Sequence, residues 1–296
     1  MDKRVQFDFV IEFTNGGGVQ GQGFRLDIEG DDISDQELAD SIIRDMRLLM
    51  VGRVSISNKQ ILMEPHKRTS TQPLASAAPR YVDLSHTIES GLITYKGLPA
   101  PLICDYLSRE ESRKQYAPGT TFQIGKIEMV TNTGTYLDCP FHRYEHGKDL
   151  SQVGVERLAD LEGIVVRADY HAQMALDASF FRDKELRGRA VLVHTGWDAH
   201  WNSDAYFEYH PHLTEDAAQY LVECGVQLVG IDSVNIDDTS GGARPVHTTL
   251  LGAEVLIVEH LCNLDQLPDE GFRFSALPPK FKGAGTFPVR AVARIE

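Results

Sequence analysis

Residues 132–150 of this 296-residue chain read "NTGTYLDCPFHRYEHGKDL" and gather acidic side chains, two histidines, two tyrosines and a cysteine around Gly134 and Pro140. Three residues separate Asp138 from His142, and one of them is Pro140. Because proline restricts a local helix, a turn would aim the two side chains toward one point. A carboxylate and an imidazole are both suitable metal ligands. The stretch therefore indicates a metal site built on a loop.

Two later residues could complete the ligand set. His247 precedes "TTLLG", and Glu259 ends the apolar run "VLIVE", where a charge at the end of a buried strand needs a partner. Two imidazoles and two carboxylates would balance a divalent cation and leave a fifth position for water, which indicates hydrolysis. The spacing alone is also compatible with ordinary capping or core hydrogen bonds, because the four residues come from two distant segments.

Composition describes a soluble globular chain with a full core, at 42% hydrophobic and 24% charged residues. The net charge of -14 and the pI of about 5.2 argue against nucleic acid or an anionic membrane as a partner. No apolar run approaches the roughly 20 residues of a membrane span, and the start "MDKRVQFDFVIEF" lacks the apolar region of a signal peptide. We therefore expect a cytoplasmic protein that binds a small-molecule substrate.

Residues 1–70 read as a small α+β domain of the order ββαββ. "VQFDFVIEF" and "VQGQGFRLDI" alternate around "TNGGG", which predicts a hairpin. "SDQELADSIIRDMRLLMVG" predicts an amphipathic helix of about five turns that begins at Ser34, has Glu37 as its capping-box partner and ends at Gly52. "RVSISNKQILM" predicts two short strands about "SNK". The polar, proline-bearing residues 71–80 read as a linker.

From residue 81 to residue 296 the chain changes to many short strands with few long helices. "EGIVVRADY", "RAVLVHTGW", "VQLVGIDSV", "AEVLIVEHL" and "TFQIGKIEMVTN" are strand candidates, several of them too continuously apolar to face solvent. We expect them to form a buried sheet. "TEDAAQYLVECG" predicts a helix capped by Thr214 and ended by Gly225. The expected class is an α+β or α/β domain with a mixed sheet.

These segments carry a family resemblance. From "YVDLSHTIESGLITYKGLPAP" through "HTGWDAHW", "VGIDSVNID" and "PVHTTLLGAEVLIVEHLCNL" to "PVRAVA", residues 81–296 resemble the cyclase family that includes bacterial kynurenine formamidase and isatin hydrolase. The resemblance implies a swivelling β/β/α fold around a mixed sheet and a homodimer or higher homo-oligomer. It also implies zinc- or manganese-dependent opening or cleavage of amide bonds in aromatic substrates. We expect this chain to hydrolyse a small aromatic or cyclic amide or lactone.

The family motif HxGTHxDxPxH reads "NTGTYLDCPFH" in this chain, so Asn132 and Tyr136 replace two histidine ligands. With those imidazoles missing, we expect one divalent ion, zinc or manganese. The ligands that the resemblance implies are Asp138, His142, His247 and Glu259.

The resemblance assigns His146 as the general acid/base, and we expect Tyr136 and Asn132 to orient the substrate's oxygen. Two other functions stay open. The chain could be a ligand-binding or scaffold protein without hydrolytic activity, or it could use the same metal site as a lyase or cyclase.

Overall fold

The computed structural model describes residues 2–28, 30, 32–46, 48, 50–64 and 79–295, and most of the expected linker, residues 71–78, lies outside them. The chain divides into two compact units, Met1–Ala75 and Ser76–Glu296. Among the described residues, no helix is both long enough and apolar enough to cross a membrane.

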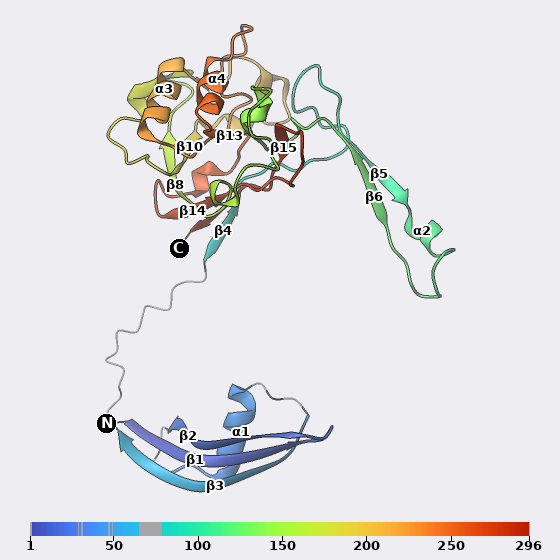
Figure 1. Ribbon diagram of the computed structural model, residues 1–296, viewed down its shortest axis with the longest axis vertical. Coiled ribbons are helices and arrows are strands. Elements are labelled where there is room, and N and C mark those ends of the chain that lie inside the picture. Colours follow the sequence, from blue (N-terminus) through green and yellow to red (C-terminus); the bar gives the residue numbers. More distant parts are fainter. Residues whose placement is uncertain are drawn as a thin grey trace. The chain divides into compact units, whose positions relative to one another are not determined.

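The smaller unit is a three-stranded antiparallel sheet of order β2-β1-β3 with one helix (Figure 1). Its elements are β1 (Asp2–Phe13), β2 (Gly18–Ile28), α1 (Asp35–Asp45) and β3 (Val51–Glu64). Alternate residues of β1, from Val5 to Ile11, point to one face and pack there against Leu38 and Ile42 of α1. Ser34 and Glu37 form the expected capping box at the start of this helix.

Two details of this unit differ from the sequence prediction. The helix ends at Asp45, well before Gly52, because β3 begins at Val51 and pairs with the end of β1 at Phe13. The two strands expected about "SNK" are one continuous strand, so the order is ββαβ. Asn58 takes a positive φ of 53° where the β1–β3 register shifts, so the turn-forming residues are absorbed as a bulge.

The larger unit is built on a nine-stranded mixed sheet, which confirms the predicted α/β class. In sheet order the strands are β15 (Thr286–Pro288), β7 (Tyr136–Asp138), β13 (Leu256–Glu259), β12 (Leu228–Ile231), β10 (Ala190–His194), β8 (Leu161–Arg167), β14 (Phe272–Ser275), β16 (Val292–Ile295) and β4 (Arg80–Asp83). The four strands from β13 to β8 are parallel, and the strands on both sides of them pair antiparallel.

The four parallel strands are buried on both faces, as their apolar runs predicted. On one face, α3 (Glu215–Cys224) and α4 (Pro245–Gly252) pack against each other and against Val191 and Ile257. On the other face, Leu192 and Val258 pack with the C-terminal strands. Helix α3 ends at Gly225 in the left-handed conformation, as expected.

Shorter elements lie in the connections. They are the two-stranded sheet β9 (Ala175–Leu176) and β11 (His212–Leu213), and the 3-10 helices η1 (Pro140–His142), η2 (Val155–Arg157), η3 (Ala178–Phe180), η4 (Trp197–His200), η5 (Asp204–Phe207) and η6 (Leu264–Gln266).

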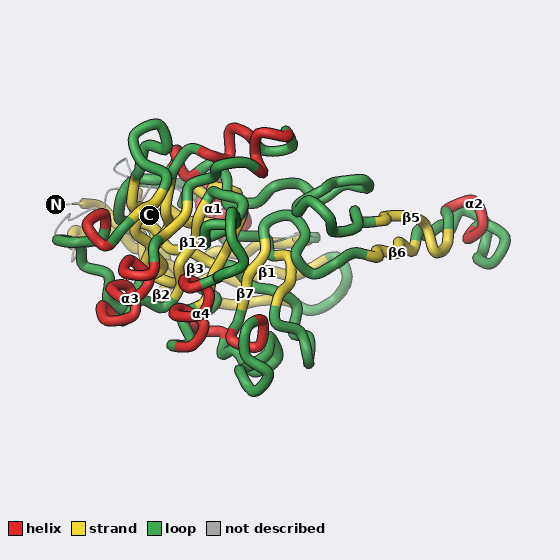
Figure 2. The backbone as a smooth tube through the Cα atoms, turned by 90° about the horizontal axis from the view of Figure 1, so that it is seen from above, coloured by secondary structure: helices red, strands yellow, loops and turns green. Residues whose placement is uncertain are grey.

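A two-stranded arm projects from the larger unit (Figures 1 and 2). It consists of β5 (Leu102–Leu107), α2 (Arg109–Ser112) and β6 (Ile124–Glu128). The strand expected within "TFQIGKIEMVTN" forms, but its predicted place in a buried sheet is wrong, because β6 pairs with β5 in a separate two-stranded sheet and is exposed along its length. Large apolar side chains are exposed on this arm: Leu102, Ile103, Tyr106, Tyr116, Phe122, Ile124 and Ile127.

Candidate metal centre

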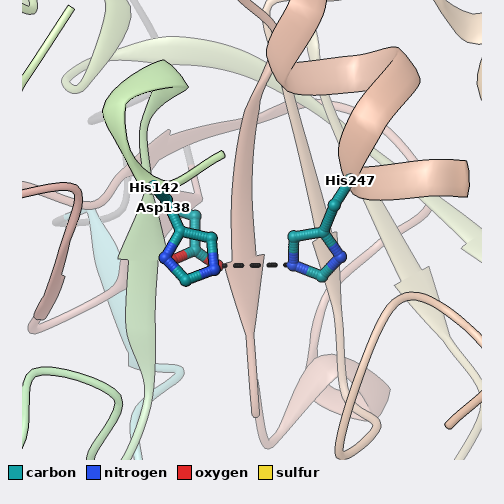
Figure 3. A group of neighbouring side chains, drawn as sticks. All are labelled: Asp138, His142 and His247. Carbon is teal, nitrogen blue, oxygen red and sulfur yellow. Dashed lines mark ion pairs between the residues drawn. The ribbon is translucent and has the colours of Figure 1, made fainter. Parts of the chain in front are cut away.

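Asp138, His142 and His247 meet at one edge of the sheet although they lie far apart in the sequence. Asp138 ends β7, His142 follows on η1, and His247 lies in the first turn of α4 (Figure 3). Each offers one ligand atom, and these atoms all lie within 4.8 Å of one another. The turn therefore does aim the acid and the imidazole toward a shared point, and α4 supplies a second imidazole.

Thr286 of β15 orients the two residues of the turn. Its hydroxyl donates to Oδ1 of Asp138 and lies 2.8 Å from Nδ1 of His142. Because the hydroxyl has one proton, Nδ1–H of His142 must donate to it, which leaves Nε2 of His142 available as a ligand. The other carboxylate oxygen, Oδ2 of Asp138, is buried and has no hydrogen-bond partner within the described part of the chain.

Asp237 orients His247 in the same way. Its Oδ2 accepts from Nδ1 of His247 at 2.6 Å, and its carboxylate also accepts from the backbone amides of Val246 and His247. Nε2 of His247 then faces Oδ2 of Asp138 at 3.7 Å, the pair joined by the dashed line in Figure 3. This carboxylate–histidine arrangement fixes the tautomer that a metal ligand needs.

Buried negative groups outnumber positive ones at this centre, because Asp138, Asp237 and Glu259 all surround His247. Burial opposes a charge on His247, but the nearby carboxylate of Asp138, the hydrogen bond with Asp237 and the charge of Glu259 outweigh it and raise its pKa to about 10. Burial and the charge of Asp138 raise the pKa of Glu259 to about 7, against the charge of His247. The centre favours a positive charge, and its residues fit a divalent cation.

Glu259, the expected fourth ligand, lies beside the three. Its Oε1 is 3.7 Å from Nε2 of His247 and accepts from the backbone amide of Ile236. Its Oε2 accepts from the hydroxyl of Tyr136 at 2.6 Å. Burial, followed by the charges of Glu259 and Asp138, raises the pKa of the Tyr136 phenol well above 10, so the phenol keeps its proton. Tyr136 therefore stands in the position of a motif histidine and holds Glu259.

A cavity of about 790 Å³ opens over this centre. Five of the predicted site residues line it: Asn132, Tyr136, His142, His247 and Glu259. Asp138 lies buried beside His142 and His247. Tyr95, Leu98 and Pro245 give the cavity an aromatic and apolar wall, as is usual for small-molecule sites.

The structure does not bring His146 to the centre. His146 is exposed on the turn after η1, where the amide of Gly147 bonds back to the carbonyl of Tyr144, and it is not among the residues that line the cavity. Conversely, Asp237 and Thr286 were not predicted from the sequence. Both lie in other segments than the ligands they orient, so no motif spacing marks them.

The fold agrees with the comparisons with known proteins. The family model described as "Putative cyclase" matches residues 82–238, more than half of the chain. Kynurenine formamidases from Bacillus anthracis and Geobacillus thermodenitrificans are each 27% identical, over 217 and 222 residues, which cover 73% and 72% of this chain and 97% of each relative.

Two solved structures extend the comparison. A "potential metal-dependent hydrolase with cyclase activity" is 25% identical with a TM-score of 0.61 and covers 74% of this chain and 99% of its own. Isatin hydrolase A from Labrenzia aggregata, bound to benzyl benzoate, shares the fold with a TM-score of 0.64 at 23% identity, over 75% of this chain and 96% of its own. This chain belongs to the cyclase family.

Proposed function

We propose that this chain is a metal-dependent hydrolase of a small aromatic or cyclic amide or lactone, and that it uses one divalent ion, zinc or manganese. The observation that carries the proposal is Oδ2 of buried Asp138, which has no hydrogen-bond partner among the described residues and faces Nε2 of His247 beside a cavity large enough for a small molecule. The kynurenine formamidases and the 25% identical metal-dependent hydrolase support the reaction class.

Asp138, His142 and His247 would hold the ion, with Glu259 as the adjacent second carboxylate. When bound, such an ion supplies Lewis-acid polarisation of a carbonyl and lowers the pKa of water. Asn132 and Tyr136 offer only an amide and a protonated phenol, which are far poorer zinc or manganese ligands than imidazole. A second ion close to the first would therefore lack the ligands to offset their mutual repulsion.

The remaining residues position groups and move protons. Thr286 and Asp237 keep the two imidazoles in the ligand tautomer. Asn132, in the cavity wall, can donate its amide to a substrate oxygen. His146 stays our prediction for the general acid/base, and it requires the exposed turn to approach the cavity. The alternative proton carrier is the hydrogen-bonded pair of Tyr136 and Glu259.

Metal analysis tests the single-ion proposal. Protein dialysed against limiting zinc or manganese should hold about one ion per chain, and the double change Asn132→His with Tyr136→His should raise this capacity toward about two. Two ions in the unchanged protein would make Asn132 or Tyr136 a ligand. No bound metal, with no loss of stability on chelation, would support the binding or scaffold function instead.

A substrate screen tests the reaction class. Aryl formamides, cyclic amides and lactones would be incubated with the protein in water enriched in oxygen-18, and the masses of the products would be measured by mass spectrometry. Hydrolysis must place the labelled oxygen in the product. A product formed without the label would show elimination or cyclisation, and so a lyase or cyclase built on the same metal site.

We also propose a homodimer in which a second copy of the chain covers the arm. An isolated two-stranded ribbon is only marginally stable in water. This ribbon also exposes seven large apolar side chains, which a partner surface would remove from water. Ile103 and Ile127 lie directly opposite each other across the two strands. Replacing both by lysine should convert dimers into monomers in sedimentation velocity. Monomers of the unchanged chain at micromolar concentration would refute the dimer.

A further inference from the structure

Two arginines line the cavity beside the candidate metal centre. Arg143 directly follows His142, a proposed metal ligand, and Arg244 immediately precedes the first residue of α4. Although the chain carries a net charge of -14, neither guanidinium lies within ion-pair distance of a carboxylate in the described ranges. Arginines at structural positions in this unit, such as Arg157 and Arg189, do have carboxylate partners.

Arg143 is anchored at one end of its guanidinium. Its Nε donates to Oγ1 of Thr248 at 3.2 Å, and its Cζ lies over the ring of Tyr144 at 5.8 Å from the centroid. The hydroxyl of Thr248 in turn donates to the backbone carbonyl of Arg244. Nη1 and Nη2 of Arg143 have no hydrogen-bond partner in the part of the chain that the structure describes. This leaves the fork of donors that matches the two oxygens of a carboxylate.

Arg244 is half-buried and fixed by its own loop. Its Nη1 donates to the carbonyls of Asp238, Gly241 and Ala243 at 3.3, 2.8 and 2.6 Å. Its charge also reaches the cavity, because it acts to lower the pKa of the Tyr95 phenol, which burial raises. A half-buried cation that faces a cavity without a counter-charge is costly unless a ligand supplies one.

The acids of the cavity do not serve these arginines. Glu259 is bonded to Tyr136 and lies beside the metal ligands. Glu215 also lines the cavity, but it is exposed in the first turn of α3 and accepts a hydrogen bond from Gln219. The cavity therefore has two unlike regions, one rich in carboxylates that suits a cation and one with two guanidinium groups that suits an anion.

On the basis of the proposed function, we propose that the substrate carries a carboxylate group, which Arg143 and Arg244 bind while its amide or lactone carbonyl lies at Asp138, His142 and His247. The aromatic and apolar wall that includes Tyr95 would contact the body of the substrate between its two polar ends. The arginines thus select acidic substrates over neutral ones of the same shape.

Binding of a non-reactive probe tests the anion site without turnover. Benzenesulfonate and methyl phenyl sulfone have nearly the same shape and differ in charge, and a sulfonate is a weak metal ligand. In calorimetry with the full-length protein, benzenesulfonate should bind roughly tenfold or more tightly, as expected for charge-assisted hydrogen bonds. Arg143→Gln should remove this preference. Arg182→Gln, an exposed arginine outside the cavity lining, is the matched control and should keep it.

Kinetics with a substrate pair tests the same residues during turnover. For ortho-formamidobenzoate, KM should be roughly tenfold or more below the value for formanilide, which lacks the carboxylate, and Arg143→Gln should abolish the difference. Arg244→Gln could loosen the loop that Nη1 ties together, so Arg244→Lys serves as its partner variant. Lysine keeps the charge but not the fork, and it should retain only part of the preference.

The two proposals fail separately. Equal binding of the charged and neutral probes, or equal KM values that Arg143→Gln does not change, would overturn the carboxylate site and leave the hydrolase intact. Arginine-dependent binding of benzenesulfonate without turnover of either formamide would support the anion site while contradicting the proposed amide hydrolysis.

Discussion

Two neighbouring groups of histidines in the larger unit have opposite electrostatic surroundings. At the metal centre, His247 lies among three buried carboxylates, and its pKa is raised to about 10. In the adjacent cluster, His260 is fully buried beside Tyr206, and His86 stacks on Trp201 with ring centroids 3.8 Å apart. Burial lowers the pKa of His86 to about 4 and that of His260 well below 6.5.

The comparison shows that the charges of its partners, and not burial alone, decide what a buried histidine can do. Both groups contain a buried polar atom without a hydrogen-bond partner among the described residues, Oδ2 of Asp138 in one and Nε2 of His260 in the other. Carboxylates raise the pKa of His247, whereas burial lowers the pKa of His86, and burial and neighbouring histidines lower that of His260. Tyr136 separates the two, because its ring contacts His260 while its hydroxyl donates to Glu259. We therefore expect the metal at the first group alone.

The largest effect should come from the metal ligands themselves. Asp138→Asn removes the charge whose Oδ2 faces His247, and it should lower metal affinity by more than the ~10–100-fold that loss of an outer partner costs. Asp237→Asn, which changes such a partner, should fall within that range. Metal titration of both variants checks the order. Unchanged metal affinity in Asp138→Asn would contradict the inference that carboxylates direct the metal to the histidine group that contains His247.

A smaller effect is expected at His146. His146→Ala should keep the metal content and melting temperature and lose ~100-fold in turnover, the range of general acid/base catalysis. Loss of metal would instead make His146 a ligand. Unchanged turnover would instead assign proton transfer to the pair of Glu259 and Tyr136. In that case Tyr136→Phe should lower turnover.

The neutral group predicts a pH dependence of stability. The folded state keeps His86 uncharged down to about pH 4, whereas the unfolded chain protonates it near 6.5. The contribution of neutral His86 to the free energy of unfolding is therefore complete above pH 6.5, and it is lost as the pH falls toward 4. His86→Phe preserves the stacking on Trp201. It should reduce the slope of the unfolding free energy against pH by up to about 1.4 kcal/mol per pH unit. Urea unfolding at pH 4 to 7 measures this slope, and an unchanged slope in the variant would contradict a neutral His86 in the folded state.

The smallest effect should follow removal of the first unit. None of the metal-site residues lies before Ser76, and the smaller unit has its own core. A chain that starts at Ser76 should keep its metal content and its activity. The free energy of unfolding of the larger unit should change by no more than about 0.5 kcal/mol, the range that surface substitutions usually cause. Metal analysis and sedimentation check this. Precipitation or dissociation into inactive monomers would make the smaller unit part of the assembly.

The sequence by itself determined the local elements and part of the site. Alternation predicted the β1–β2 hairpin, Ser34 and Glu37 predicted the start of α1, and continuous apolar runs predicted the buried parallel strands. The turn at Pro140 placed Asp138 and His142 together. These features depend on dihedral preferences and periodicity within a few residues, which the sequence carries directly.

Only the tertiary structure decided the partners. Pairing of β7 with β13 and β15 brought Tyr136 to Glu259 and Thr286 to Asp138, across more than 100 residues of sequence. The same chain geometry left His146 outside the cavity and β6 on an exposed arm. Local patterns cannot specify such contacts, because strand pairing is set by the burial and register of the whole sheet.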